Sequence, residues 1–191
     1  MGIKKDFGNI NMELLDVLDE NGNLTGEKME RGKVHELGIW HRCVHIWIIN
    51  SKGELLLQKC AKKPQKNLGG LWDVSAAGHV EAGETVEEAA LKELREELGL
   101  EIPFEEFILL KELKISVSMG DRGFKNHFDV VFLIKKDLDT TKLNLQEEEV
   151  EKVEFVHWRK VRERFLNNDP TLAIRNQEFE ILFEYLENNS L

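Results

Sequence analysis

Residues Gly78 to Leu100 read GHVEAGETVEEAALKELREELGL, a glycine-bounded loop followed by an acidic segment. Thr85 and Glu88 have the spacing of a capping box, in which each side chain satisfies the other residue's backbone N–H at a helix start. Gly99 suits the left-handed backbone position that ends many helices. The sequence therefore predicts one helix between these two ends, entered from a tight loop.

Three glutamates share one face of this predicted helix. Glu93, Glu96 and Glu97 stand at positions i, i+3 and i+4, so they project from within about 100° of its circumference. Like charges so placed repel each other, and a hard cation reverses that. Mg²⁺ takes oxygen ligands and keeps several waters, which suits carboxylates together with a substrate phosphate. A solvated acidic face is the alternative, but Ala89 and Ala90 project into the same sector, which puts the glutamates at the border of the buried side.

The stretch resembles the signature box of the Nudix hydrolases, Gly-x5-Glu-x7-Arg-Glu-apolar-x-Glu-Glu-x-Gly-apolar. Every spacing of the box is present, and one position departs from it, since a lysine replaces the family's arginine. The matching residues are Gly78, Glu84, Lys92, Glu93, Leu94, Glu96, Glu97, Gly99 and Leu100. The resemblance implies an α/β fold, the Nudix-type α/β/α sandwich around a mixed β-sheet.

Composition bounds the class of protein. The chain has 191 residues, 41% of them hydrophobic and 32% charged, which suits one soluble domain. No apolar run reaches the roughly 18 residues of a membrane helix, and MGIKKDFGNI lacks the apolar core of a secretory signal. Cys43 and Cys60 are too few for a disulfide framework. The net charge of −10 argues against a nucleic-acid partner, so we expect a cytoplasmic protein with neither a nucleic-acid nor a membrane partner.

The chain order predicts a single domain, residues 1–191, in three parts: an N-terminal leader hairpin (1–39), a Nudix core (40–160) and a C-terminal helical extension (161–191). Alternating and β-branched patterns predict the strands, and apolar spacing predicts the last helices. We expect strands at 12–18, 41–50, 54–59, 71–77, 104–115, 127–134 and 153–158, a polar loop at 116–125, and helices at 161–166 and 171–186.

The resemblance implies hydrolysis of a diphosphate joined to another group. By position, Glu93, Glu96 and Glu97 would bind the metal, with the backbone carbonyl of Ala77 as a fourth ligand. Glu84 would assist through the metal shell, and Lys92 would hold the first glutamate of the box by an ion pair. Mg²⁺ is the expected cofactor, with Mn²⁺ as a substitute, and the expected partner is a small-molecule diphosphate. A homodimer is left open.

Residues outside the box have two readings each. The run Glu147–Glu149 lies where a later loop could supply a general base, but it also suits a solvated acidic turn. Lys59 and Lys66, the better candidates of a basic group that includes Lys62 and Lys63, could receive a phosphate, and Trp72 could stack on a base. Solubilising charges and core packing are the respective alternatives.

A second resemblance covers nearly the whole chain. The runs MELLDVLDENG, LLLQKCAKKP and GGLWDVSAAGHV, with His35 and His41, are similar to isopentenyl-diphosphate delta-isomerases. These Nudix-fold enzymes hold a metal with histidines and a glutamate pair, and a cysteine before Gly-His handles the proton. This chain has Ala77 at the position of that cysteine, and the side chain of alanine can neither donate nor accept a proton.

The glutamate pair of the isomerases would fall near Lys125 and His127, and neither is a carboxylate. His35, His41 and His79 are therefore either inherited ligands or plain polar residues. Three functions stand: an Mg²⁺-dependent diphosphohydrolase, which the complete box favours, an isomerase, and a non-catalytic Nudix binding or sensor module. The sequence does not identify the substrate.

Overall fold

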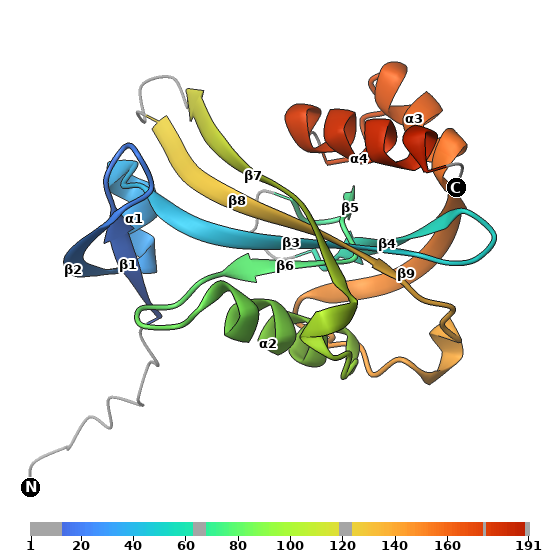
Figure 1. Cartoon of the computed structure of the whole chain (residues 1–191), viewed down its shortest axis with the longest axis horizontal. Coiled ribbons are helices and arrows are strands. Elements are labelled where there is room, and N and C mark those ends of the chain that lie inside the picture. Colours follow the sequence, from blue (N-terminus) through green and yellow to red (C-terminus); the bar gives the residue numbers. More distant parts are fainter. Residues whose placement is uncertain (1–12, 63–67, 119–123, 174, 190–191) are drawn as a thin grey trace, which may run out of the picture.

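A computed structural model describes residues 13–62, 68–118, 124–173 and 175–189. A leader hairpin pairs two strands in a sheet of their own, and a short helix follows it (Figure 1). The leader elements are β1 (Leu14–Leu18), β2 (Leu24–Glu30) and α1 (Arg31–Leu37). The hairpin was expected, whereas the charged sequence of α1 gave no helical signal.

In the described part of the chain, the body is one seven-stranded sheet with helices on both faces. Its strands are β3 (His41–Ile49), β4 (Glu54–Cys60), β5 (Trp72–Asp73), β6 (Ala76–His79), β7 (Phe107–Ser118), β8 (Phe124–Lys135) and β9 (Val150–His157). Its helices are α2 (Val86–Leu98), α3 (Trp158–Leu166) and α4 (Asn176–Asn188), with 3₁₀ turns η1 (Phe104–Glu106) and η3 (Thr140–Lys142). None of the helices within the described residues is both long and apolar enough to cross a membrane.

The sheet is mixed. Its strands run in the order β5-β4-β3-β8-β7, with β6 paired to β3 and β9 paired to β4. Only the β3–β8 pair is parallel among the described strands. This arrangement confirms the expected α/β/α sandwich around a mixed sheet.

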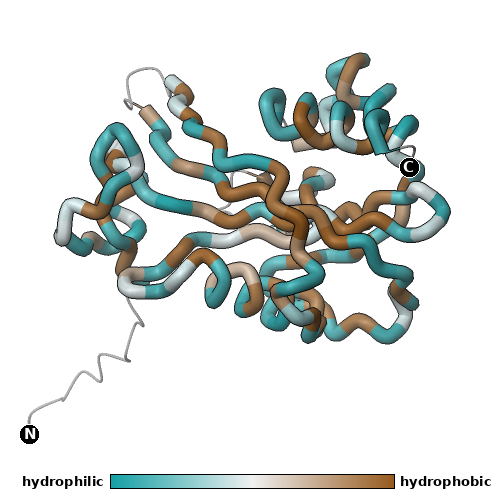
Figure 2. Tube along the Cα trace, in the orientation of Figure 1, coloured by the Kyte–Doolittle hydropathy of each residue, from teal (hydrophilic) through white to brown (hydrophobic). Residues whose placement is uncertain are grey.

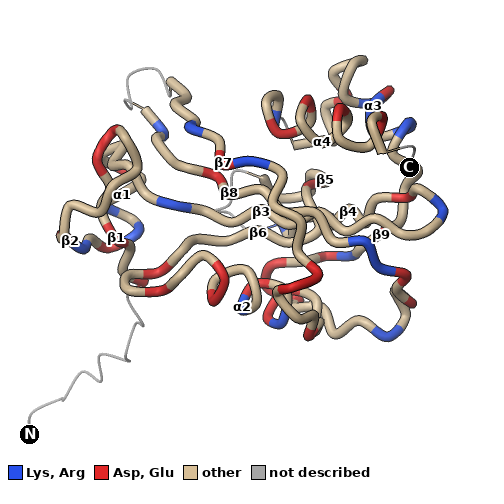
Figure 3. The backbone as a smooth tube through the Cα atoms, viewed as in Figure 1, with Lys and Arg blue, Asp and Glu red and all other residues tan. Residues whose placement is uncertain are grey.

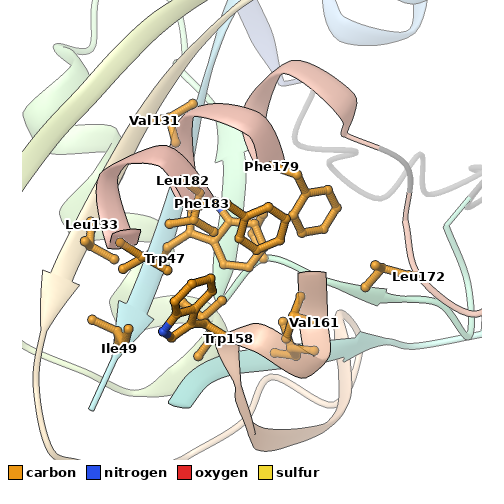
Figure 4. Packing of buried hydrophobic residues seen from close by; sticks show 14 of the residues in the cluster. Trp47, Ile49, Val131, Leu133, Trp158, Val161, Leu172, Phe179, Leu182 and Phe183 are labelled. Atoms are coloured by element: carbon orange, nitrogen blue, oxygen red, sulfur yellow. The ribbon is translucent and has the colours of Figure 1, made fainter. Parts of the chain in front are cut away.

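The alternation of side chains along β3 divides the core in two. Val44, Ile46 and Ile48 face α2, where they pack against small and branched residues of that helix. Trp47 and Ile49 face α3 and α4, and Figure 4 shows them below the aromatic rings of α4. The hydrophobic residues accordingly gather in the central strands and on the inner sides of the helices (Figure 2).

Two predicted strands take different partners or bounds. The expected hairpin of β3 and β4 pairs only at Ile49 and Leu55, beside the turn, because β6 occupies the rest of that edge of β3 and β4 pairs along its length with β9. The expected strand 71–77 is split into β5 and β6. At the break, Ser75 Oγ donates to the Leu56 carbonyl at 2.6 Å and accepts from the Ile48 N–H at 2.8 Å.

Two other boundaries were wrong. The expected loop 116–125 is strand at both of its described ends, since β7 and β8 stay paired as far as Ser118 and Phe124; residues 119–123 lie outside the described part of the chain. The last helix begins at Asn176 instead of residue 171. Leu172 instead forms a parallel bridge with Trp72, in which the Trp72 N–H donates to the Thr171 carbonyl and the Ala173 N–H donates to the Trp72 carbonyl, each at 2.8 Å.

Candidate active site

The helix of the box forms as its sequence predicts. Thr85 Oγ1 accepts from the Glu88 N–H at 3.2 Å, and Glu88 Oε2 accepts from the Thr85 N–H at 2.8 Å. Gly99 ends the helix in the left-handed region, with φ 67°. Acidic residues line this helix and the loop that leads into it (Figure 3). The capped helix gives the glutamates a rigid support.

Glu93 lies directly against the backbone of β6. A Cβ atom added to Gly78 would lie 2.0 Å from the carboxyl carbon of Glu93, so only glycine leaves room for this contact. Burial raises the pKa of Glu93 to about 7; the nearby Lys92 opposes this, and Glu96, Glu13 and Glu84 add to it. A carboxyl group in this surrounding gains from taking up either a proton or a cation at neutral pH.

Glu97 is buried, and its Oε2 accepts a hydrogen bond from the Ala77 N–H at 3.1 Å. Glu96, by contrast, is exposed. Among the described residues, no group of three metal-ligating atoms within 4.8 Å of one another includes a glutamate of the box. Glu93 and Glu97 thus meet neighbouring residues of β6, while the convergence of all three carboxylates on one ion stays a prediction.

Lys92 contacts the loop before the helix. Its Nζ donates to Glu81 Oε1 at 2.8 Å and to Glu84 Oε2 at 3.0 Å. Burial lowers the pKa of Lys92, but these two carboxylates outweigh it and raise that pKa to about 12. Glu84 Oε2 also accepts from the Glu81 N–H at 3.0 Å. The lysine therefore ties the loop to the helix through Glu84 and Glu81, while its part in catalysis stays a prediction.

The later acidic loop lies at the end of α2. The Gln146 N–H donates to the Glu97 carbonyl at 3.1 Å, and the Asn144 N–H donates to the Leu98 carbonyl at 3.2 Å. Within the run that follows, Glu149 is partly buried and Glu147 and Glu148 are exposed. The acidic run thus begins close to Glu97. The role of the run Glu147–Glu149 as the source of a general base stays a prediction.

The predicted substrate residues have partners within the chain. Lys59 donates to Glu151 at 2.6 Å, and the ammonium group of Lys152 lies 4.9 Å from the ring centre of Trp72. A phosphate at Lys59, or a base on this face of Trp72, would have to compete with these contacts. Lys66 lies outside the described residues.

Three histidines from separate elements meet on the side of β3 and β6 that faces away from α2. The ligand atoms of His35, His41 and His79 all lie within 4.8 Å of one another, and His35 Nε2 lies 3.1 Å from His79 Nε2. His41 Nδ1 lies 2.9 Å from the Ile39 carbonyl, which fixes the proton on Nδ1 and leaves Nε2 with a lone pair.

Burial is the largest effect on all three imidazoles. It lowers the pKa values of His35 and His41 to about 4 and that of His79 well below its usual value. The rings are therefore neutral at pH 7, as metal ligands must be. Three converging imidazole nitrogens fit a divalent transition metal, which prefers nitrogen donors more than Mg²⁺ does.

A buried charge network lies further along the same face of the sheet and was not found from the sequence. Arg175, just before α4, donates to both carboxylate oxygens of Asp73, at 2.5 and 2.7 Å. Glu178 accepts from the Trp47 indole at 2.7 Å and lies 2.8 Å from His45 Nδ1. Burial lowers the pKa of His45, and Asp129 and Glu178 outweigh this, so the net shift is upward.

His127 and Asp129 continue this row on β8. His127 Nδ1 lies 2.5 Å from Asp129 Oδ1. Burial acts to raise the pKa of Asp129, but His45 and His127 lower it to about 2. The one sequence signal is the pair of histidines His41 and His45, which lie on the same face of the strand because they are four residues apart.

A glycine-bounded acidic helix packed on a mixed α/β/α sheet is the architecture of a Nudix protein. The model of the NUDIX domain matches residues 39–177, and the chain belongs to this family.

Relatives within the family carry two kinds of name. Nudix hydrolase 3 of Arabidopsis thaliana is 34% identical over 182 residues, which are 91% of this chain and 23% of that protein, so the chain spans under a quarter of this relative. Isopentenyl-diphosphate Delta-isomerase 2 of Photorhabdus laumondii is 30% identical over 158 residues, 83% of this chain and 84% of that protein. The crystal structure of DR0079 from Deinococcus radiodurans superposes with a TM-score of 0.68 at 22% identity, over 88% of this chain and 97% of that one.

Proposed function

We propose that the chain is an Mg²⁺-dependent Nudix hydrolase that cleaves a diphosphate linkage in a nucleoside-diphosphate-type or other organic diphosphate, in the cytoplasm. The observation that carries the proposal is the complete set of glutamates in the box, with Glu93 against Gly78 and Glu97 bonded to the Ala77 N–H. A bound divalent ion would neutralise charge on the diphosphate and lower the pKa of a water ligand.

Residues of the box would bind the ion and hold the surrounding loop in place. Glu93, Glu96 and Glu97 would hold the ion, with the Ala77 carbonyl beside them on β6. Burial raises the pKa of Glu93 to about 7, and a bound cation would offset the cost of holding this buried carboxylate in its charged form. Lys92 and Glu84 would fix the loop that leads into the helix, through the 3.0 Å contact between them.

The test incubates the purified protein with Mg²⁺ and a panel of nucleoside diphosphates and their conjugates, and follows release of phosphate and nucleotide. Release should disappear with a chelator. Glu97→Gln should abolish turnover and leave the circular dichroism spectrum unchanged, whereas Glu87→Gln, on an exposed position of the same helix, should match the wild type. Full activity of Glu97→Gln would overturn the assignment of the metal site.

The cluster of His35, His41 and His79 favours a second candidate, an isopentenyl-diphosphate isomerase that uses a transition metal. Its ligand atoms converge within 4.8 Å and its imidazoles are neutral at pH 7. Ala77 counts against it, because no proton donor stands where the isomerases have a cysteine. Incubation with isopentenyl diphosphate, followed by analysis for the isomer, separates the candidates. If neither assay forms product, a binding or sensor module is favoured.

A further inference from the structure

We propose that Glu13, which the leader supplies just before β1, is a positioning residue that orients His79 within the three-histidine cluster. The inference rests on the metal-binding role suggested above for that cluster. It gives the leader a part in building the site, beyond covering one end of the sheet.

The leader is fixed against the loop of the box. The Ala82 N–H donates to the Leu14 carbonyl at 2.8 Å, and the Gly83 N–H donates to Asp16 Oδ2 at 2.7 Å. Leu15 forms an antiparallel bridge with Glu81 between these two contacts. Strand β1 thus runs beside the residues that follow His79, which brings the residue before β1 to the histidine.

Two contacts with Arg31 hold Glu13 in place. The Arg31 N–H donates to the Glu13 carbonyl at 3.0 Å, and Arg31 Nη1 donates to Glu13 Oε2 at 2.7 Å. The other carboxylate oxygen, Oε1, lies 3.4 Å from Nδ1 of His79. The glutamate therefore faces the histidine with one oxygen while the arginine holds the second.

This contact selects the tautomer of His79. A carboxylate beside Nδ1 favours the proton on that nitrogen, so the lone pair of His79 is on Nε2, the atom that lies 3.1 Å from His35 Nε2. The Ile39 carbonyl does the same for His41. Two of the three rings thus have an acceptor at Nδ1, the arrangement by which proteins orient histidine ligands and raise their basicity.

The experiment titrates the metal-free protein with Co²⁺, followed by its visible absorption, with excess Mg²⁺ present to occupy carboxylate sites. Glu13→Ala should weaken Co²⁺ binding about 10- to 100-fold, and Glu13→Gln, which keeps an acceptor oxygen, should recover part of it. Glu27→Ala, on an exposed position of the same hairpin, is the matched control and should bind as the wild type does. His35→Asn should abolish the signal.

A second readout is independent of metal. Nitrogen-15 NMR of the imidazoles should show His79 protonated on Nδ1 in the wild type and in Glu13→Gln, and a shift toward the other tautomer in Glu13→Ala. Equal Co²⁺ affinity and an unchanged tautomer in Glu13→Ala would overturn the positioning role. A wild type that binds no Co²⁺ would overturn the inference at its premise, the metal role of the cluster, and would leave the hydrolase proposal standing.

Discussion

Neutral buried histidines should make the unfolding free energy of this protein depend on pH, and His41 allows a sharp test. Its side chain is only 3% exposed, and burial lowers its pKa from 6.5 to about 4. As the pH falls below 6.5, the unfolded chain takes up this proton first. Because the native pKa is the lower one, stability is full above pH 6.5 and is lost as the pH falls toward 4.

The size of the effect follows from the two pKa values. Between pH 7.5 and pH 5, the difference in proton binding at His41 lowers the unfolding free energy by about 2 kcal/mol. The variant His41→Gln lacks this group. The stability of the wild type relative to this variant should therefore fall by about 2 kcal/mol between pH 7.5 and pH 5.

The measurement is urea unfolding of both proteins at pH 7.5, 6 and 5 with a chelator present, so that bound metal does not add to the stability. The comparison of wild type with variant removes the effects of the other titrating groups that the two proteins share. A gap that stays the same from pH 7.5 to pH 5 would show that His41 is not held neutral by burial.

Three further predictions concern the box and the charge network. Gly78→Ala places a Cβ 2.0 Å from the Glu93 carboxyl carbon, and a displacement of about 1 Å should lower kcat about 100-fold in steady-state hydrolysis assays, with an unchanged far-ultraviolet spectrum. Arg175→Met leaves the buried Asp73 without the arginine that binds both of its oxygens. Urea unfolding should show a loss of about 3–5 kcal/mol, which a second change, Asp73→Leu, should largely restore. Lys92→Arg should keep full activity, because the guanidinium group of arginine can donate to both carboxylates that the lysine contacts. Lys92→Met, which has no donor, should lower activity in the same assay.

Local patterns were enough to predict the parts of the site that one segment supplies. The helix of the box, its cap at Thr85 and its end at Gly99 follow from spacing alone, and the structure has all three. The central strands follow from their apolar runs. The partners of each strand do not, because β4 pairs with β9, almost a hundred residues later, instead of with its neighbour along most of its length.

The charge network and the histidine cluster depend on such distant pairings. Arg175 and Asp73 are 102 residues apart, and His35 and His79 are 44 apart. Their types and positions were visible in the sequence, but nothing local indicated that they meet. The late start of α4 was equally hidden, since Thr171 and Ala173 are hydrogen-bonded to the backbone of Trp72, far away in the sequence.

The short strand β6 contributes to both candidate sites, the glutamates of the box and the three-histidine cluster. Its residues alternate between the two faces of the sheet. Gly78 pairs with Val44, which faces α2, and it receives Glu93 on that side. Ala77 and His79 pair with His45 and Cys43, on the opposite side.

The two candidate sites therefore lie on opposite faces of one strand. A change of side chain at residue 77 removes a proton donor from the histidine face, while the backbone N–H of the same residue still holds Glu97. The glutamates of the box contact the backbone N–H of Ala77 and the space left by Gly78, so we expect the hydrolysis proposed above not to depend on the side chain at residue 77. If so, Ala77→Cys should leave diphosphate hydrolysis unchanged, and any gain of isomerase activity in that variant should require His35, His41 and His79. Loss of hydrolysis in Ala77→Cys would show instead that the two faces are coupled.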